Sequence, residues 1–277
     1  MKHKIIADSC CDMTPELRAR LDVTNVPLNI MLGDAHYTDD DSIDLPAFMA
    51  DMAACTGKIG TAAPSPLLYK EAFATAESSF GITLSSRLSG SHSSAVNGKA
   101  LLEEESDNDV YVFDSKSAAA GEVLVALELH RLIEKGEPKP TIIASIEEFI
   151  KNMKTYFVLD NVDNLLKSGR LNKVVGKVIT FLNIRPIMGS DGDGSIALFG
   201  TARGQNQIIE KLVNLVKKSD RDTKGKSMVI THCCNLPLAE RLRQAVEQAF
   251  TFAEILVVPT RALSSFYANA GGIVLAF

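Results

Sequence analysis

Short runs of aliphatic residues recur along the first half of the chain, each followed by a stretch with helical spacing. The runs at 4–7, 82–84 and 110–113 have the length of buried strands. Strands that alternate with helices in this way are typical of a parallel sheet with helices on its faces. The pattern therefore predicts an α/β fold whose N-terminal part is a Rossmann-like domain built on a parallel sheet.

Two predicted helix starts in the N-terminal half carry capping residues. Thr14 precedes Pro15 and Ser65 precedes Pro66, which places a hydroxyl at the N-cap and a proline at the first helical position. Between these two helices, residues 23–31 are expected to form one extended segment. Further helices are predicted at 45–54, 91–104 and 118–134.

The pattern changes after residues 136–140, Gly-Glu-Pro-Lys-Pro, which are predicted to be a linker. Strands are then expected at 157–159, 184–188, 196–199, 228–231, 255–258 and 273–277, with helices at 205–218 and 238–249. We therefore predict an N-terminal domain over 1–150 and a mixed α/β C-terminal domain over 151–277. The Asp-Gly-Asp-Gly run at 191–194 lacks the downstream ligands of a calcium loop and is predicted to be a hairpin turn.

Two predicted strands end on the same polar pair, Asp8-Ser9 and Asp114-Ser115. Such residues suggest a polar carboxyl edge of the sheet, which is where ligands bind in open α/β folds. The chain contains neither a G-x-G-x-x-G fingerprint nor a Walker A lysine motif, so no dinucleotide and no other cofactor is expected.

The net charge and the hydropathy of the chain limit the kinds of partner that the protein can be expected to bind. The net charge of -5 argues against nucleic acid, because such binding needs a basic face. No apolar run approaches the ~20 residues of a membrane span, so no membrane insertion is expected. The start of the chain reaches Asp8 before a signal-peptide core could form. These features predict a cytoplasmic protein.

Four of the five cysteines form adjacent pairs, Cys10-Cys11 and Cys233-Cys234. Adjacent cysteines rarely share one zinc ion, so reduced thiols and no metal site are expected. Cys10 lies near a predicted helix start, where a thiol pKa is lowered, which leaves a reactive thiol as an alternative.

Two hydroxyl-rich turns, 61–66 and 85–91, each precede a predicted helix. Free N–H groups at a helix start, together with the hydroxyls of Thr61 and Ser89, would make a socket for a small anion. Three interpretations stay open: a site for a carboxylate or for a small phosphorylated metabolite, ordinary helix caps, and a serine esterase using Ser89 with His92. The esterase interpretation lacks the G-x-S-x-G elbow.

Several short motifs are spread over the whole chain. They are Asp8-Ser9-Cys10 with Asp12, Thr61 with Pro64-Ser65, Ser85-Ser86 with Leu88-Ser89-Gly90, Asp114-Ser115, Leu165 to Leu171 with Gly169-Arg170, Arg185-Pro186-Ile187 and Thr201-Ala202-Arg203. In order and spacing this set resembles the DegV family, bacterial fatty-acid-binding proteins that include the carrier subunit of fatty acid kinase. The resemblance covers essentially all 277 residues.

The resemblance implies a lipid-binding protein that is not itself an enzyme. It implies that Thr61 and Ser89 hold the carboxylate of a long-chain fatty acid, with help from backbone N–H groups near Gly90. The acyl chain would run into an apolar tunnel at the junction of the two domains. A separate kinase subunit would phosphorylate the carboxylate to an acyl-phosphate. Arg170 and Arg203 are candidates for contacting that phosphate or the kinase, and the alternative is that both are solvated arginines at helix ends.

One segment departs from the family pattern. Many members carry His-x-Gly-Pro-Gly near the end, where this chain has Tyr267-Ala268-Asn269-Ala270-Gly271. Support of the carboxylate would then come from the Tyr267 hydroxyl, without a charge. His232 is an alternative source of an imidazole, although a structural role is the simpler interpretation of this histidine.

Overall fold

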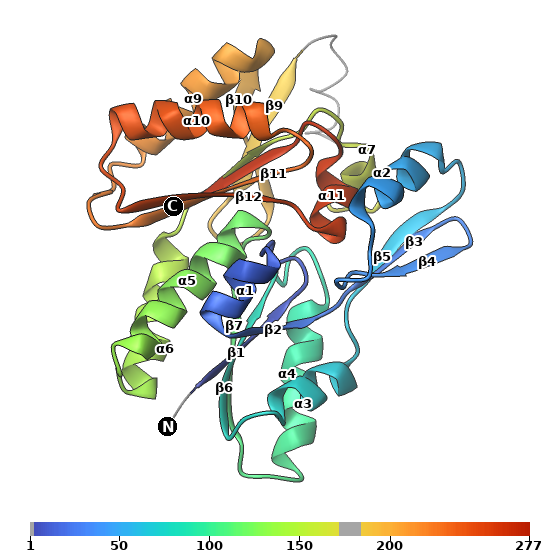
Figure 1. The fold of residues 1–277 in the computed structure, drawn as a ribbon, viewed down its shortest axis with the longest axis vertical. Coiled ribbons are helices and arrows are strands. Elements are labelled where there is room, and N and C mark those ends of the chain that lie inside the picture. Colours follow the sequence, from blue (N-terminus) through green and yellow to red (C-terminus); the bar gives the residue numbers. More distant parts are fainter. Residues whose placement is uncertain (1–2, 172–183) are drawn as a thin grey trace.

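The computed structural model describes residues 3–171 and 184–277. Its N-terminal part is built on a four-stranded parallel sheet in the order β2-β1-β6-β7 (Figure 1). The strands are β1 (Lys4–Asp8), β2 (Val23–Val26), β6 (Ser78–Thr83) and β7 (Asp109–Asp114). The predicted parallel sheet is therefore confirmed. The strand order changes direction between β1 and β6, so their carboxyl ends border the kind of crevice in which α/β proteins bind ligands.

Helices cover both faces of this sheet. They are α1 (Pro15–Leu21), α3 (Pro66–Phe73), α4 (Ser91–Glu103) and α5 (Ala120–Glu134). The α1 and α5 helices pack together on one face, and α3 and α4 pack together on the other (Figure 1). The predicted N-caps are confirmed, because the Thr14 hydroxyl accepts from Leu17 N at 3.2 Å and the Ser65 hydroxyl from Leu68 N at 3.3 Å.

A small antiparallel sheet, in the order β4-β3-β5, extends from the N-terminal part beside α2 (Figure 1). Its strands are β3 (Asn29–Leu32), β4 (Ala35–Thr38) and β5 (Ile59–Ala62), and α2 spans Leu45–Ala54. The single extended segment predicted at 23–31 is wrong. It is two strands in different sheets, separated by Pro27, whose missing N–H cannot continue a ladder.

The C-terminal part is built on a six-stranded mixed sheet in the order β10-β9-β8-β13-β11-β12, which confirms the predicted mixed α/β character. Its strands are β8 (Thr155–Val158), β9 (Arg185–Ser190), β10 (Ile196–Ala202), β11 (Ser227–His232), β12 (Glu254–Pro259) and β13 (Ile273–Ala276). Two helices, α9 (Gly204–Lys218) and α10 (Leu236–Ala249), pack on its outer face. The 191–194 run is the turn of the β9–β10 hairpin, as expected.

The two large sheets share one apolar core through α5, which lies between them (Figure 1). The linker predicted at 136–140 is instead the turn from α5 into a further helix, α6 (Lys139–Asn152). The α6 helix buries Ile142, Ile146 and Ile150 in the core cluster that α5 occupies. Each isoleucine contributes about 1.5–3 kcal/mol by burial. The division of the chain at residue 150 stays a prediction.

Two short helices complete the part of the fold that surrounds the candidate site. The α7 helix spans Asp163–Lys167, and α11 spans Ala262–Ala268. Within residues 3–171 and 184–277, none of the helices combines the length and apolar character needed to cross a bilayer.

Candidate functional site

A cavity of about 920 Å³, measured out to its mouth, lies where the carboxyl edge of the parallel sheet faces the mixed sheet. Apolar side chains form most of the wall; among them are Leu84, Leu88, Phe157, Leu159, Leu165 and Leu263. These residues come from both halves of the chain, so neither half could form the cavity alone.

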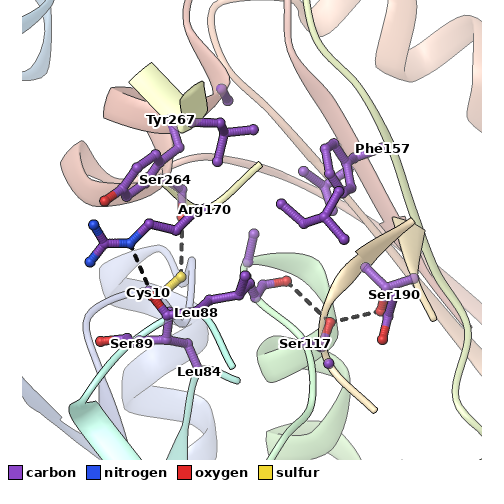
Figure 2. A pocket seen from close by; sticks show the side chains of 18 of the residues that line it. Cys10, Leu84, Leu88, Ser89, Ser117, Phe157, Arg170, Ser190, Ser264 and Tyr267 are labelled. Carbon is purple, nitrogen blue, oxygen red and sulfur yellow. Dashed lines mark hydrogen bonds between the residues drawn. The ribbon is translucent and has the colours of Figure 1, made fainter. Parts of the chain in front are cut away.

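One end of the cavity is polar. The hydroxyls of Thr61, Ser89 and Tyr267 and the guanidinium of Arg170 line it together. The Thr61 Oγ1 and Tyr267 Oη atoms are 2.7 Å apart and share a hydrogen bond. Figure 2 shows the Ser89 hydroxyl, the Arg170 guanidinium and the Tyr267 ring on the same side of the cavity, away from Phe157. The structure thus brings together four of the residues that the sequence singled out.

The turn that carries Ser89 ends in the long helix α4. The Ser89 hydroxyl accepts a hydrogen bond from Ser91 N at 3.2 Å, and Gly90 is the N-cap residue of α4 without a capping side chain. Gly90 lies against the other hydroxyl-rich turn, since a Cβ at this position would be 3.8 Å from that of Ala63. Thr61 is not a cap, because it lies inside β5 and bonds Tyr267.

Arg170 is held by backbone carbonyls at the edge of the cavity. Its Nε donates to Leu88 O at 3.1 Å and its guanidinium NH1 donates to Ser168 O at 2.8 Å. Arg203 has a different position. It is exposed at the start of α9, outside the cavity lining, and its backbone N–H donates to the Gln207 side chain at 2.5 Å.

Cys10 lies in the cavity wall, with its Sγ 3.8 Å from the Ser264 hydroxyl (Figure 2). Burial raises the pKa of the Cys10 thiol, and the nearby Asp8 carboxylate raises it further. The alternative of a reactive thiol at this position is therefore wrong, because the helix start is outweighed by burial and by acidic neighbours. All five cysteines are free, as expected.

Residues of the β9–β10 hairpin line the side of the cavity away from Arg170, where Figure 2 shows Ser117 and Ser190. The Ser117 and Thr155 hydroxyls bond each other at 2.7 Å, and the Ser190 hydroxyl donates to Lys116 O at 3.0 Å. These polar groups satisfy one another, so they leave the wall free to contact an apolar ligand.

The histidines considered from the sequence lie away from the polar end. The Nδ1 atom of His92 pairs with the Thr83 hydroxyl at 3.3 Å, and that of His232 accepts from Asn235 N at 3.3 Å. In the described parts of the chain, no histidine forms a hydrogen bond with Ser89. No cluster of three or more His, Cys, Asp or Glu residues suited to a metal ion is found in those parts either.

The fold and the cavity define an α/β ligand-binding protein whose site has a long apolar wall and one hydroxyl-rich end. The family model of DegV matches residues 2–277, and the chain belongs to this family. A DegV domain-containing protein from Streptococcus pyogenes serotype M1 is 34% identical over 280 residues, which cover 100% of this chain and 99% of that protein.

Solved structures give the same result. A DegV family protein from Ruminococcus gnavus, refined with vaccenic acid, has a TM-score of 0.95 and 37% identity, with both chains fully covered. The Fatty Acid Kinase (Fak) B3 protein from Streptococcus pneumoniae, loaded with linoleic acid, has a TM-score of 0.93 and 33% identity over 100% of this chain and 99% of that one. A family member from Eubacterium eligens, loaded with heptadecanoic acid, has a TM-score of 0.92 and 28% identity over 99% of this chain and 98% of that one.

Proposed function

We propose that this protein binds a long-chain fatty acid. Thr61 and Ser89 hold the carboxylate, with the backbone near Gly90, and the acyl chain lies along the apolar wall between the two large sheets. The observation that carries this proposal is a mostly apolar cavity at one end of which the hydroxyls of Thr61, Ser89 and Tyr267 lie together with Arg170. The fatty acids bound by the three related proteins support the same ligand class.

The chemistry of the site suits such a ligand. Burial of an acyl chain gains about 0.8 kcal/mol per methylene, which offsets the desolvation of a carboxylate. Neutral hydroxyl donors orient that carboxylate without neutralising it. Tyr267 supports the arrangement through its bond to Thr61, so it acts on the carboxylate end without adding a charge.

We further propose that the protein is a carrier that presents the fatty acid to a separate kinase and performs no chemistry itself. A hydroxyl-bound carboxylate keeps an oxygen able to attack a γ-phosphoryl group. Arg170, at the polar end, is suited to the charge of the acyl-phosphate. Exposed Arg203 is suited to a contact with the kinase. The Fak B3 relative, described as a fatty acid kinase protein, supports this role.

The other two interpretations receive less support. An esterase needs a base on the Ser89 hydroxyl, and among the described residues no histidine forms a hydrogen bond with it. A small phosphorylated metabolite would leave most of the apolar wall without a partner.

Titrations with oleic acid and with oleyl alcohol test the carboxylate site. We expect Ser89→Ala to weaken the binding of oleic acid at least about tenfold, because a hydrogen bond to a charged group contributes about 1.5–3 kcal/mol. Binding of the alcohol should change little. The matched control is Ser93→Ala, which removes an exposed hydroxyl on the first turn of α4, outside the cavity lining. Equal effects of the two substitutions, or wild-type protein that binds no fatty acid, would contradict the proposal.

A further inference from the structure

Two aspartates at strand ends hold the 85–91 turn that carries Ser89. They are Asp8, the last residue of β1, and Asp114, the last residue of β7. Asp114 accepts from the N–H and the hydroxyl of Ser86, at 3.1 and 2.5 Å, near the beginning of the turn. Asp8 is 0% exposed and lies beneath the turn.

The Asp8 carboxylate binds both ends of the turn. One oxygen, Oδ2, accepts from Leu84 N at 2.9 Å, just before the turn, and from the Ser91 hydroxyl at 2.6 Å, at its end. The other oxygen, Oδ1, accepts from Cys10 N at 3.1 Å. Ser91 in turn donates its N–H to the Ser89 hydroxyl. Asp8 is therefore connected through Ser91 to the Ser89 hydroxyl, the group proposed to hold the ligand.

We propose that Asp8 is a positioning residue for fatty-acid binding: by fixing both ends of the 85–91 turn, it directs the Ser89 hydroxyl toward the ligand carboxylate. This inference rests on the proposed function. Asp8 does not line the cavity and touches no ligand group itself. Asp8 orders the turn before the ligand arrives, so less conformational entropy is lost when the ligand binds.

Glu122, in the first turn of α5, provides Asp8 with a neutral partner. It is 0% exposed, and among the described residues no N–H or hydroxyl group donates to either of its oxygens. Burial raises the pKa of Glu122, as do the charge of Asp8 and a hydrogen bond between the two carboxyls. Burial raises the pKa of Asp8 as well, but the hydrogen bonds from Ser91 and Leu84 oppose that rise, so Glu122 is the carboxyl of this pair that binds a proton more readily. Asp8 then remains an acceptor for all three of its other donors.

The test compares three substitutions that each replace a carboxyl with an amide. Asp8→Asn removes the charge and leaves a single accepting oxygen. Because Leu84 N and the Ser91 hydroxyl share Oδ2, an amide NH2 at that position loses both ends of the turn, and at the Oδ1 position it loses Cys10 N. We expect it to weaken oleic acid binding at least about tenfold and oleyl alcohol binding by less than about twofold. Asp114→Asn is the matched control, because within the turn Asp114 bonds only Ser86 and not Ser91, the residue that bonds Ser89. Glu122→Gln keeps a donor toward Asp8. Both should retain the preference for the acid.

A second variant covers the case in which Asp8→Asn does not fold. Ser91→Ala removes only the link between Asp8 and the end of the turn, and it should lower the acid-over-alcohol preference in the same way. Tyr69→Phe is its control, because the Tyr69 hydroxyl bonds Ser91 Oγ at 2.6 Å and, among the described residues, forms no hydrogen bond with Asp8. Thermal unfolding of each variant reports how much of any change is a loss of stability.

The outcomes separate this inference from the function on which it rests. If the wild type shows no preference for the acid over the alcohol, the proposed carboxylate site fails. If the wild type has that preference and both Asp8→Asn and Ser91→Ala keep it, the positioning role is overturned. An equal loss of acid and alcohol binding also overturns it, because a purely structural role would weaken both ligands alike.

Discussion

At the scale of single residues, buried carboxyls connect the start of the chain with the helix that carries Tyr267. The first N–H groups of α11 are bound by two of them. Arg261 N donates to Asp12 at 2.7 Å, and Ala262 N donates to Asp39 at 3.2 Å. Burial raises the pKa of Asp39 to about 6, against the opposing charge of Arg261. This carboxyl should therefore titrate in a range that ordinary stability measurements reach.

We expect Asp39→Asn to change the pH dependence of stability. The raised folded-state pKa means that neutral Asp39 stabilises the protein fully below about pH 4, and that this contribution is lost as the pH rises through about 6. The amide has no charge to lose. The variant should therefore gain, relative to the wild type, on the order of 3 kcal/mol in free energy of unfolding between pH 4 and pH 7. Urea unfolding at several pH values measures the difference; a difference that does not vary with pH would contradict this account.

The sequence predicted which residues line the site better than it predicted the contacts that these residues make with one another. The sequence singled out Thr61, Ser89, Arg170 and Tyr267, and all four line one cavity. It gave no sign that Thr61 and Tyr267 bond each other, because 206 positions separate them and only the fold brings them together. It singled out Asp8 as a strand end, but the contact with Ser91 depends on the pairing of β1 with β6.

At the scale of elements, the β9–β10 hairpin joins the mixed sheet to the parallel sheet beside the cavity. The Ser85 hydroxyl, at the start of the 85–91 turn, donates to Gly194 O at 2.8 Å. Gly194 has a φ of +94°, and a Cβ there would be 2.2 Å from Ser85 Oγ. Only a residue without a Cβ leaves room for this contact, so Gly194 determines how closely the hairpin packs against the N-terminal part.

Gly194→Ala should speed the release of a bound fatty acid, by roughly fivefold if one neutral hydrogen bond of about 1 kcal/mol is lost. Gly192→Ala is the matched control. Its φ is +102°, so it carries similar backbone strain, but a Cβ there meets nothing within 4 Å. Dissociation of a fluorescent fatty acid, followed by stopped flow, compares the two. Equal release rates for both variants would show that the contact with Ser85 does not hold the cavity closed.

Elements with a clear hydrophobic period could be predicted, and those defined by distant pairing could not. Helix α2 lies at the predicted residues, and α9 and α10 lie within two residues of their predicted starts. The small sheet was missed because β4 is mostly polar and exposed, so no alternating apolar pattern marks it. The sequence does not predict helix α6, because Gly136, Pro138 and Pro140 together indicate a break in a helical pattern. Pro140 in fact lies in the first turn of the helix, where proline is tolerated.

At the scale of the whole molecule, the cavity is a consequence of how the sheets meet. Helix α5 packs against both large sheets, and the small sheet brings Thr61 to the polar end. The fold class and the two kinds of sheet followed from the sequence pattern. The shape of the cavity did not, because it depends on packing between residues far apart in the chain.

Mass spectrometry of the purified protein tests the central claim most directly, first in the native state and then after organic extraction. The account predicts about one fatty acid per chain, released on extraction as a free acid. If the protein carries none, added oleic acid should bind at a one-to-one ratio. A protein that is empty and that also fails to bind added fatty acids would contradict the account.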